Sequence, residues 1–337
     1  MAKTAKIGIN GFGRIGRMVF RQLVTMKDVE VVSINDLTDS QTLAHLLKYD
    51  TAHGRFNGTV KADGSALVVN GKKIQITAER DPKNIPWKSL GVDLVVESTG
   101  FFVSKEASQA HIDAGAKKVL ISAPAKGDLK TVVYSVNEKN IKPTDNIISA
   151  ASCTTNALAP VVDVLNKKFG VTRGFMTTIH AYTGDQPTHD RPHKDLRRGR
   201  AGAANFVPTT TGAAVAVGLV LPELNGKLDG IAVRGPIITG SLVDLVIEFN
   251  KDASVKEINS AIKKASSHSL AYVEDPIVSS DIVGDTHGSI FDAGMTKELN
   301  VDGKKMFKII TWYDNENSYV SQYVRVLRHT LGLKVTQ

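Results

Sequence analysis

The 337-residue sequence contains a single cysteine, Cys153. One thiol excludes an intrachain disulfide and any metal site built from several cysteines, so we expect no metal, and any thiol chemistry must belong to Cys153. The sequence also lacks an apolar run of the roughly 18 residues that a membrane-spanning helix requires. No signal-peptide pattern precedes the first apolar segment. We therefore expect a soluble cytoplasmic protein.

Internal repeats and low-complexity segments are absent as well. The composition, with 42% hydrophobic and 23% charged residues, is that of a folded chain, and its length predicts two domains. The formal net charge of +8 fits an anionic substrate or cofactor, but it also fits non-specific binding to nucleic acid or to an anionic surface. Because the basic residues are scattered, charge alone does not decide between these.

The N-terminal region carries the pattern of a dinucleotide-binding unit. An apolar stretch at residues 6–10 precedes a G-x-G-x-x-G sequence at residues 11–16, and apolar residues at helical spacing follow it. A second apolar stretch, residues 29–34, leads to Asp36, where such units place the carboxylate that binds the ribose hydroxyls. The glycines alone would also fit an ordinary strand-to-helix turn. A carboxylate repels the ribose phosphate of NADP, so Asp36 favours NAD.

Further strands are predicted by four apolar segments, at residues 66–69, 73–76, 93–97 and 118–121. The last two are typical of buried parallel strands. Ser98 and Ser122 follow these two directly, at the carboxyl ends where open α/β sheets bind ligands, although most such residues simply form loops. The first half of the chain therefore predicts an α/β, Rossmann-type domain.

Cys153 lies at the predicted start of a helix. A strand-like stretch, residues 147–151, leads to Ser152 as the expected N-cap, and apolar residues at helical spacing continue to Gly170, which can end the helix. In the first turn the helix dipole favours a thiolate. Pro160 in the interior predicts a kink. The alternative is that Cys153 is a small buried hydrophobic residue, the usual state of a lone cysteine.

His180 ends an alternating stretch, residues 175–180, that predicts a strand. A histidine at a strand end is more often structural than catalytic, but next to an activated thiol it could act as the base. A long irregular stretch, residues 186–205, contains several cations, which form either a functional loop or a solvated face.

Four later segments complete the predicted secondary structure. Residues 209–212 should open a helix, which would be a good place for an anion. Residues 230–234 and 242–249 predict strands of a mixed or antiparallel sheet, and residues 322–331 predict a closing helix.

Four runs, at residues 10–17, 151–156, 180–186 and 312–316, match a known family. Through them the sequence resembles the glyceraldehyde-3-phosphate dehydrogenases over nearly the whole chain, and the run Ala-Ser-Cys-Thr-Thr-Asn is highly specific to that family and its nearest relatives. The resemblance implies a Rossmann-type NAD-binding domain at residues 1–151, completed by a C-terminal helix at 316–337. It implies an α+β catalytic domain with a mixed sheet at residues 152–315.

The resemblance also implies roles for the matching residues. Cys153 would be the nucleophile, and His180 would activate it and carry its proton. The residues implied to bind NAD are Gly11, Arg14, Ile15, Asp36, Arg80, Ser122 and Asn315, with Tyr319 near the nicotinamide. The residues implied to bind the substrate phosphate are Thr183 and Arg234; those for inorganic phosphate are Ser152, Thr154, Thr211 and Gly212, with Arg198 close to both.

The reaction implied by the resemblance is the oxidative phosphorylation of glyceraldehyde 3-phosphate to 1,3-bisphosphoglycerate, in glycolysis or gluconeogenesis. Thiolate attack on the aldehyde gives a thiohemiacetal, hydride transfer to NAD gives a thioester, and phosphate attack releases the acyl phosphate. The family implies a homotetramer, in which the loop after Gln186 reaches the cofactor of a neighbouring subunit.

Two alternatives remain open at this point. An erythrose-4-phosphate dehydrogenase would share the cysteine, the histidine and the fold but would release an acid through water; the set Thr154, Thr211 and Gly212 favours the phosphorylating reaction. The net charge also suggests a secondary role in binding nucleic acid or a cell-surface partner, but no nucleic-acid-binding motif accompanies it.

Overall fold

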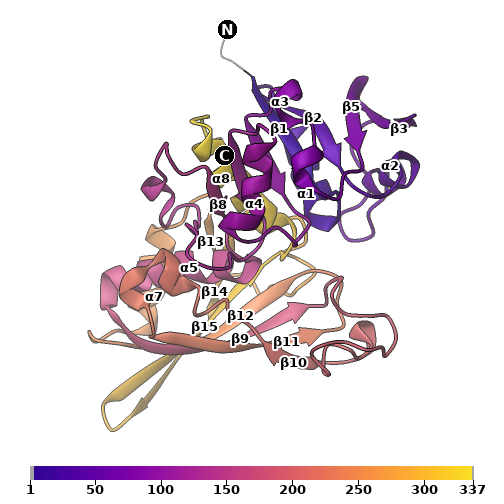
Figure 1. Ribbon diagram of the computed structural model, residues 1–337. Coiled ribbons are helices and arrows are strands. Elements are labelled where there is room, and N and C mark those ends of the chain that lie inside the picture. Colours follow the sequence, from indigo (N-terminus) through magenta and orange to yellow (C-terminus); the bar gives the residue numbers. More distant parts are fainter. Residues whose placement is uncertain (1–3, 336–337) are drawn as a thin grey trace. The chain divides into compact units, whose positions relative to one another are not determined.

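The computed structural model of the protein describes residues 4–335, which divide into two compact units (Figure 1). Residues 4–132, 138–151 and 323–335 form the first unit, and residues 133–137 and 152–322 form the second. The structure thus assigns 133–137 and 316–322 to the second unit, where the sequence had suggested the first. Residues 336 and 337 of the expected final helix lie outside the described residues. No helix within residues 4–335 is long and apolar enough to cross a membrane.

The first unit is built on one eight-stranded sheet. Its strands are β1 (Ala5–Asn10), β2 (Val29–Asn35), β3 (Val60–Asp63), β4 (Ala66–Val69), β5 (Lys72–Thr77), β6 (Leu94–Glu97), β7 (Lys118–Ile121) and β8 (Ile147–Ser149). They lie in the order β3-β4-β5-β2-β1-β6-β7-β8, and β3 and β4 form an antiparallel edge on an otherwise parallel sheet. The order reverses between β1 and β6, which is the point where sheets of this kind bind ligands.

The helices of this unit begin where local signals place them. They are α1 (Arg14–Leu23), α2 (Ser40–Lys48), α3 (Trp87–Leu90), α4 (Lys105–Asp113) and the second half of α8 (Asn317–Thr330), with short 3-10 turns at Pro82–Asn84 and Glu138–Asn140. Asp39 caps α2 by accepting from the backbone N–H of Thr42, and Ser104 caps α4 by accepting from that of Ala107. Gly13 precedes α1 without a side-chain cap, unlike the residues before α2 and α4.

The second unit contains a seven-stranded mixed sheet in the order β10-β11-β9-β12-β15-β14-β13. Its elements are α5 (Cys153–Phe169), β9 (Val171–Ala181), β10 (Val207–Thr210), α6 (Val217–Val220), β11 (Leu228–Gly235), β12 (Ser241–Phe249), α7 (Val255–Lys264), β13 (Leu270–Val273), β14 (Ser289–Val301), β15 (Lys304–Tyr313) and 3-10 turns at Gly202–Ala204 and Pro222–Leu224. The β9–β11 and β13–β14 pairs are parallel and the others antiparallel. The predicted fold class is therefore confirmed.

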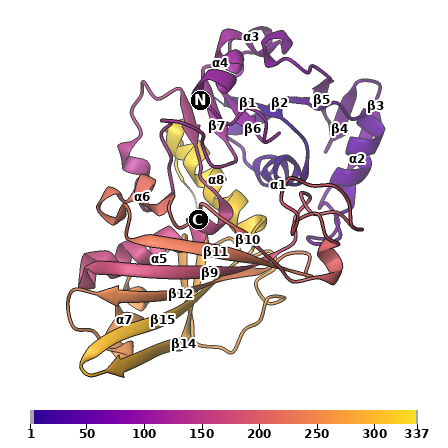
Figure 2. The ribbon, with the colours of Figure 1, turned by 60° about the horizontal axis from the view of Figure 1, so that its bottom comes forward.

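Strand β9 shows how this sheet is oriented. Met176, Thr178 and His180 alternate along it and are buried, whereas Phe175 on the opposite face is 53% exposed. Helices α5 and α7 pack on each other and on one side of the sheet (Figure 2). The buried face of β9 therefore presents His180 toward the layer that contains Cys153.

One sequence prediction is wrong here. Thr209 and Thr210 do not open a helix but end β10, where they pair with Ala232 and Ile231 of β11. The helix α6 begins only at Val217, after a turn. Threonine is β-branched and suits an edge strand, and pairing with β11 decides the conformation.

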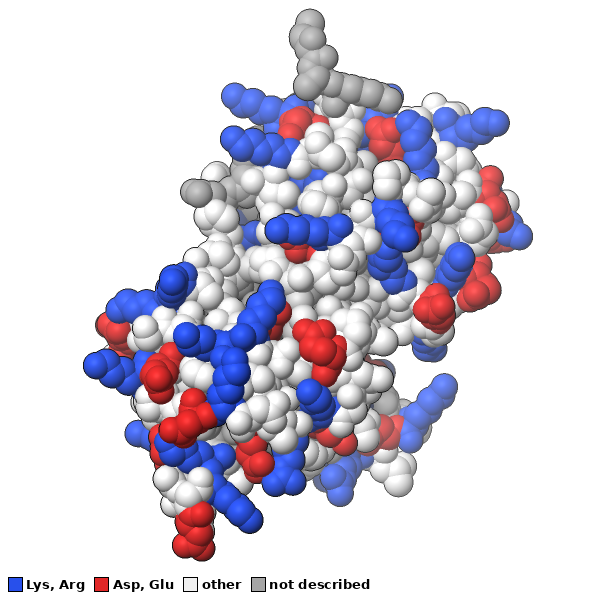
Figure 3. Space-filling view, turned by 90° about the vertical axis from the view of Figure 1, so that its left-hand side faces the viewer, with Lys and Arg blue, Asp and Glu red and all other residues white. Residues whose placement is uncertain are grey.

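The surface charge is mixed in sign. On the face of the molecule drawn in Figure 3, lysine and arginine side chains are interspersed with acidic ones and with uncharged areas. This face shows no continuous basic stripe of the kind that follows a nucleic-acid backbone.

Candidate active site

Cys153 is the first residue of α5, as the sequence predicted. The Ser152 hydroxyl accepts from the backbone N–H of Thr155 at 3.1 Å, which caps the helix, and Gly170 ends it with a φ of +71°. The helix continues through Pro160 without interruption. Cys153 is partly accessible, so a small substrate can reach it.

The thiol lies beside His180, the penultimate residue of β9. The Cys153 Sγ is 3.3 Å from His180 Nε2, and His180 Nδ1 is 2.7 Å from the carbonyl oxygen of Ala181. A carbonyl only accepts, so Nδ1 carries the ring proton and donates it to this oxygen. Nε2 is then free of a proton and can accept the one on the thiol.

Burial and the charge of Arg234 act on both members of this pair. Burial, together with the positive charge of Arg234, lowers the pKa of His180 to about 3. Burial raises the pKa of the Cys153 thiol, against the opposing effects of Arg234 and Thr154. Burial and these favourable interactions therefore act on the pKa of the thiol in opposite directions, and burial is the larger effect. His180 is arranged to take the proton when the sulfur attacks.

Arg234 completes the group around His180. It lies on β11 directly opposite His180 in the parallel β9–β11 pair. Its Nη1 donates to the Ala181 carbonyl at 3.3 Å and lies 3.1 Å from His180 Nδ1, so one carbonyl oxygen accepts from both side chains. The buried Arg234 Nε has no hydrogen-bond partner among the described residues, which leaves a charged donor for an anionic ligand.

A chain of hydroxyl groups that the sequence did not predict supports the first turn of α5. The Thr178 hydroxyl donates to the Leu242 carbonyl at 3.0 Å, so it must accept the proton of the Tyr313 hydroxyl at 2.8 Å. The Tyr313 oxygen in turn accepts from Thr154 at 2.9 Å. The Thr154 hydroxyl proton is thus already engaged. The only signal for Tyr313 was its place in the run at residues 312–316.

The residues expected to bind inorganic phosphate come together around the start of α5. Ser152 and Thr154 flank Cys153, and the Thr155 hydroxyl donates to the carbonyl of Ala213 at 3.3 Å. This bond ties the helix start to the turn that contains Thr211 and Gly212, and Gly212 is exposed.

Thr183 and Arg198 lie on the segments beside this turn. The backbone N–H of Tyr182 donates to the carbonyl oxygen of Gly235 at 3.2 Å. This hydrogen bond holds the segment that contains Thr183 beside the end of β11, where Arg234 lies. The Arg198 guanidinium donates to the Thr209 hydroxyl, to the Thr210 carbonyl and to Asp185, at 2.9, 3.0 and 3.2 Å. Arg198 therefore lies at the end of β10, just before Thr211.

The first unit contains a separate cavity of about 420 Å³ at the carboxyl ends of its parallel strands. Its lining residues are Asn10, Gly11, Gly13, Asn35, Asp36, Leu37, Glu79, Arg80, Ser98, Thr99, Phe101 and Phe102. Gly11 has a φ of +90°, and a Cβ on it would lie 2.8 Å from the backbone nitrogen of Thr99. A Cβ on Gly13 would meet nothing within 4 Å, so a ligand can approach this backbone closely.

The polar groups of this cavity fit a dinucleotide. Asp36 is fixed at the end of β2, because its carboxylate accepts from the backbone N–H groups of Phe12 and Thr38 at 2.7 and 2.9 Å. The guanidinium of Arg14 donates to Asp50 at 2.5 Å. Arg14 and Ile15 are the first residues of α1, and helix starts of this kind bind phosphate through backbone N–H groups.

Three further residues expected to bind the cofactor are not in the lining of this cavity: Ser122, Asn315 and Tyr319. Ser122 follows β7, and its backbone N–H donates to the carbonyl of Glu97 at 2.9 Å. Asn315 and Tyr319 are buried in the second unit. The Asn315 side-chain oxygen accepts from Gly240 and Ser241, at 3.1 and 2.8 Å, so the amide orientation is fixed and its NH₂ group faces away from these donors.

Comparison with known proteins places this architecture in a family. The model for the NAD binding domain of glyceraldehyde 3-phosphate dehydrogenase matches residues 5–105, and the model for the C-terminal domain of that enzyme matches residues 152–315. A glyceraldehyde-3-phosphate dehydrogenase of Streptococcus pyogenes is 58% identical over 327 residues, which cover 96% of this chain and 97% of the relative. One of Clostridium pasteurianum is 55% identical over 326 residues, covering 96% and 98%.

Proposed function

The chain belongs to the glyceraldehyde-3-phosphate dehydrogenase family, and on that premise we propose which of its residues perform each step. It is an NAD-dependent oxidoreductase that converts glyceraldehyde 3-phosphate and inorganic phosphate to 1,3-bisphosphoglycerate. The observation that supports the residue roles best is the Cys153–His180 pair, 3.3 Å apart and oriented by the Ala181 carbonyl.

Cys153 is the nucleophile of this mechanism. Its sulfur bonds to the aldehyde carbon while its proton passes to His180 Nε2, which gives the oxyanion of a thiohemiacetal and an imidazolium. The imidazolium stabilises this oxyanion and then gives it the proton, which leaves a neutral thiohemiacetal with a hydroxyl group and a neutral His180.

His180 acts again in the oxidation. When bound, NAD supplies the hydride acceptor. His180 removes the hydroxyl proton of the thiohemiacetal as hydride leaves the same carbon, and a thioester remains on Cys153. Phosphate oxygen then attacks the thioester carbon, the carbon–sulfur bond breaks, and the thiolate regains a proton from His180.

Two groups of residues hold the two phosphate groups. Thr183 and Arg234 bind the substrate phosphate, and the unpartnered Nε of Arg234 supports this role. Ser152, Thr154, Thr211 and Gly212 bind inorganic phosphate, with Arg198 close to both. Because the Thr154 hydroxyl donates to Tyr313, Thr154 offers phosphate its backbone N–H unless the hydroxyl turns.

NAD binds with its pyrophosphate at the start of α1, against the backbone of Gly11, Arg14 and Ile15. The Asp36 carboxylate accepts hydrogen bonds from the ribose hydroxyls. The other residues that we propose for the cofactor are Arg80, Ser122, Asn315 with its NH₂ group, and Tyr319 with its ring.

The protein assembles as a cytoplasmic homotetramer in this proposal. The face of the second sheet that α5 and α7 leave uncovered carries Phe175 and Ile231, which are 53% and 41% exposed. Leu196, in the loop after Gln186, is 85% exposed, as expected of a loop that reaches a neighbouring subunit. Sedimentation of a species four times the mass of the 36.3 kDa chain would support this assembly, and a monomer would contradict it.

The residue roles are tested with Cys153→Ser and His180→Asn. Cys153→Ser should abolish NADH formation while NAD still binds, because the cavity for NAD belongs to the other unit. His180→Asn should lower kcat by roughly 10²- to 10⁴-fold, the usual contribution of general acid–base catalysis. Activity retained by the serine variant would exclude the thioester mechanism.

A further inference from the structure

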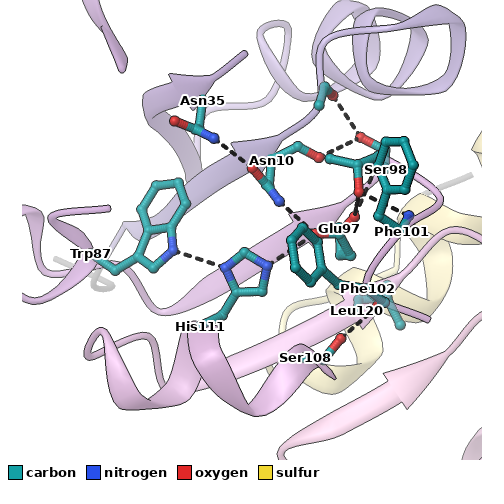
Figure 4. A network of polar contacts seen from close by, with 12 residues as sticks. Asn10, Asn35, Trp87, Glu97, Ser98, Phe101, Phe102, Ser108, His111 and Leu120 are labelled. Atoms are coloured by element: carbon teal, nitrogen blue, oxygen red, sulfur yellow. Dashed lines mark hydrogen bonds and ion pairs between the residues drawn. The ribbon is translucent and has the colours of Figure 1, made fainter. Parts of the chain in front are cut away.

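A buried carboxylate lies beneath the NAD cavity of the first unit. Glu97, the last residue of β6, is 1% exposed and accepts four hydrogen bonds (Figure 4). One carboxylate oxygen accepts from Asn10 Nδ2 at 2.7 Å and from His111 Nε2 at 2.9 Å. The other accepts from the backbone N–H and the hydroxyl of Thr99, at 2.9 and 2.5 Å. Glu97 therefore joins three separate segments of the chain.

The direction of each hydrogen bond can be assigned. An indole N–H only donates, so His111 Nδ1 accepts from Trp87 at 3.1 Å, and His111 Nε2 carries the proton that is donated to Glu97. Figure 4 shows His111 between Trp87 and Glu97, and Asn10 between Asn35 and Glu97. All four donor groups, which belong to Asn10, His111 and Thr99, face a group that only accepts, so Glu97 determines which end of the Asn10 amide faces it.

This constraint continues from Asn10 to one wall of the cavity. The oxygen of Asn10 accepts from Asn35 Nδ2 at 2.8 Å, which fixes the Asn35 amide in turn. Asn35 then exchanges two hydrogen bonds with the backbone of Glu79, each of 2.9 Å. Glu79 and Arg80 both line the cavity. The position of this wall therefore depends on the orientation of the Asn10 and Asn35 amides, which Glu97 determines.

The same carboxylate holds the opposite wall. Thr99 is bonded to Glu97 through its backbone and its hydroxyl, and the Thr99 hydroxyl accepts from the backbone N–H of Phe101 at 3.1 Å. Residues 98, 99, 101 and 102 all line the cavity. This loop packs closely on Gly11, because a Cβ at that position would lie 2.8 Å from the Thr99 nitrogen.

We propose that Glu97 is a positioning residue for NAD: it holds the Asn35–Arg80 wall and the Ser98–Phe102 wall of the cavity in the arrangement that the cofactor requires. It does so through Asn10 on one side and Thr99 on the other, without contacting the reacting atoms. This inference rests on the proposed function, since it takes NAD as the ligand of the cavity.

The direct test is Glu97→Gln, which keeps the shape of the side chain but replaces one acceptor by an NH₂ donor. That donor must face either Asn10 and His111 or Thr99, all of which donate. Turning the Asn10 amide would remove only the conflict with Asn10, because His111 still donates, and it would bring two NH₂ groups together at Asn35. We expect the KM for NAD to rise about tenfold, with kcat and the KM for glyceraldehyde 3-phosphate within about twofold of wild type.

The matched control is Tyr323→Phe. Tyr323 is buried in the same unit and donates to the Leu120 carbonyl of β7 at 2.5 Å, but it does not line the cavity. The Tyr323→Phe variant should lower the urea concentration at the midpoint of unfolding and leave the KM for NAD unchanged. An equal rise in KM for both variants would show that Glu97 acts only through general stability and would overturn the proposal.

Two further variants keep the test decisive if Glu97→Gln folds poorly. Thr99→Val keeps the side-chain shape and removes one of the four donors, and it should raise the KM for NAD about threefold. The double variant Asn10→Asp, Glu97→Gln puts an acceptor opposite the new NH₂ group and beside Asn35, so it should recover part of the loss. An unchanged KM for NAD in Thr99→Val, or no recovery in the double variant, would overturn the proposal. A wild-type protein that failed to bind NAD would instead overturn the proposed function, and this inference with it.

Discussion

Replacing Arg234 by glutamine tests the electrostatics of the reactive thiol. Burial raises the pKa of Cys153, and the charge of Arg234 is the largest effect in the opposite direction. Arg234 lies 3.1 Å from one nitrogen of His180, and the sulfur lies 3.3 Å from the other nitrogen. Removing the positive charge should therefore raise the pKa of the thiol further.

The size of the effect follows from the separation. A charge one imidazole ring away acts across roughly 7 Å, which corresponds to about 2 kcal/mol at an effective dielectric constant of about 20. Partial exposure of Arg234 screens this interaction, so we expect its loss to lower the fraction of thiolate about tenfold. Alkylation by a neutral reagent at pH 7 should then slow about tenfold, because the thiolate is the reactive form.

The assay is the rate of alkylation of the protein as a function of pH. Since the chain contains one cysteine, every modified thiol is Cys153. Arg198→Gln is the control, because Arg198 is engaged by Asp185 and Thr209 and is not among the charges that act on the thiol. The alkylation profile should move to higher pH in Arg234→Gln alone. Identical profiles for Arg234→Gln and wild type would refute the reasoning.

Three other changes have defined outcomes. Tyr313→Phe removes the middle of the Thr154–Tyr313–Thr178 chain and should lower the free energy of unfolding by about 2 kcal/mol in urea titrations; an unchanged midpoint would contradict it. Burial would raise the pKa of Asp50, but hydrogen bonds from Arg14 and the His53 backbone outweigh it and lower the pKa from 3.8 to about 2. Asp50→Asn should therefore cost about 2 kcal/mol at pH 7, and its difference from wild type should shrink as the pH falls from about 4 to about 2; a constant difference would exclude this linkage. Asp36→Ala should lower the preference for NAD over NADP in kcat/KM at least about tenfold, and an unchanged ratio would remove Asp36 from cofactor selection.

Features set by local sequence could be predicted. Ser152 and Gly170 are capping signals for the helix between them, and both ends of α5 are found where they indicate. The segments 66–69 and 118–121 form strands at those residues, because each is apolar and bounded by polar residues or glycine.

Features set by contacts between distant segments could not be predicted. The conformation of Thr209 and Thr210 depends on pairing with β11, which no local pattern reveals. Tyr313 meets Thr178 only because β12 lies between β9 and β15 and aligns their buried faces. The effect of burial, which raises the pKa of Cys153 against the helix start, likewise depends on packing between distant segments.

The most direct test of the thioester mechanism is rapid mixing of the protein with NAD and glyceraldehyde 3-phosphate in the absence of phosphate. We predict a burst of about one NADH per chain, followed by near arrest until phosphate or arsenate is added, because the acyl group on Cys153 then waits for its acceptor. Sustained turnover without phosphate would show that water releases the acyl group, and it would contradict the phosphorylating reaction. The absence of any burst, with turnover intact once phosphate is present, would contradict the acyl-enzyme itself.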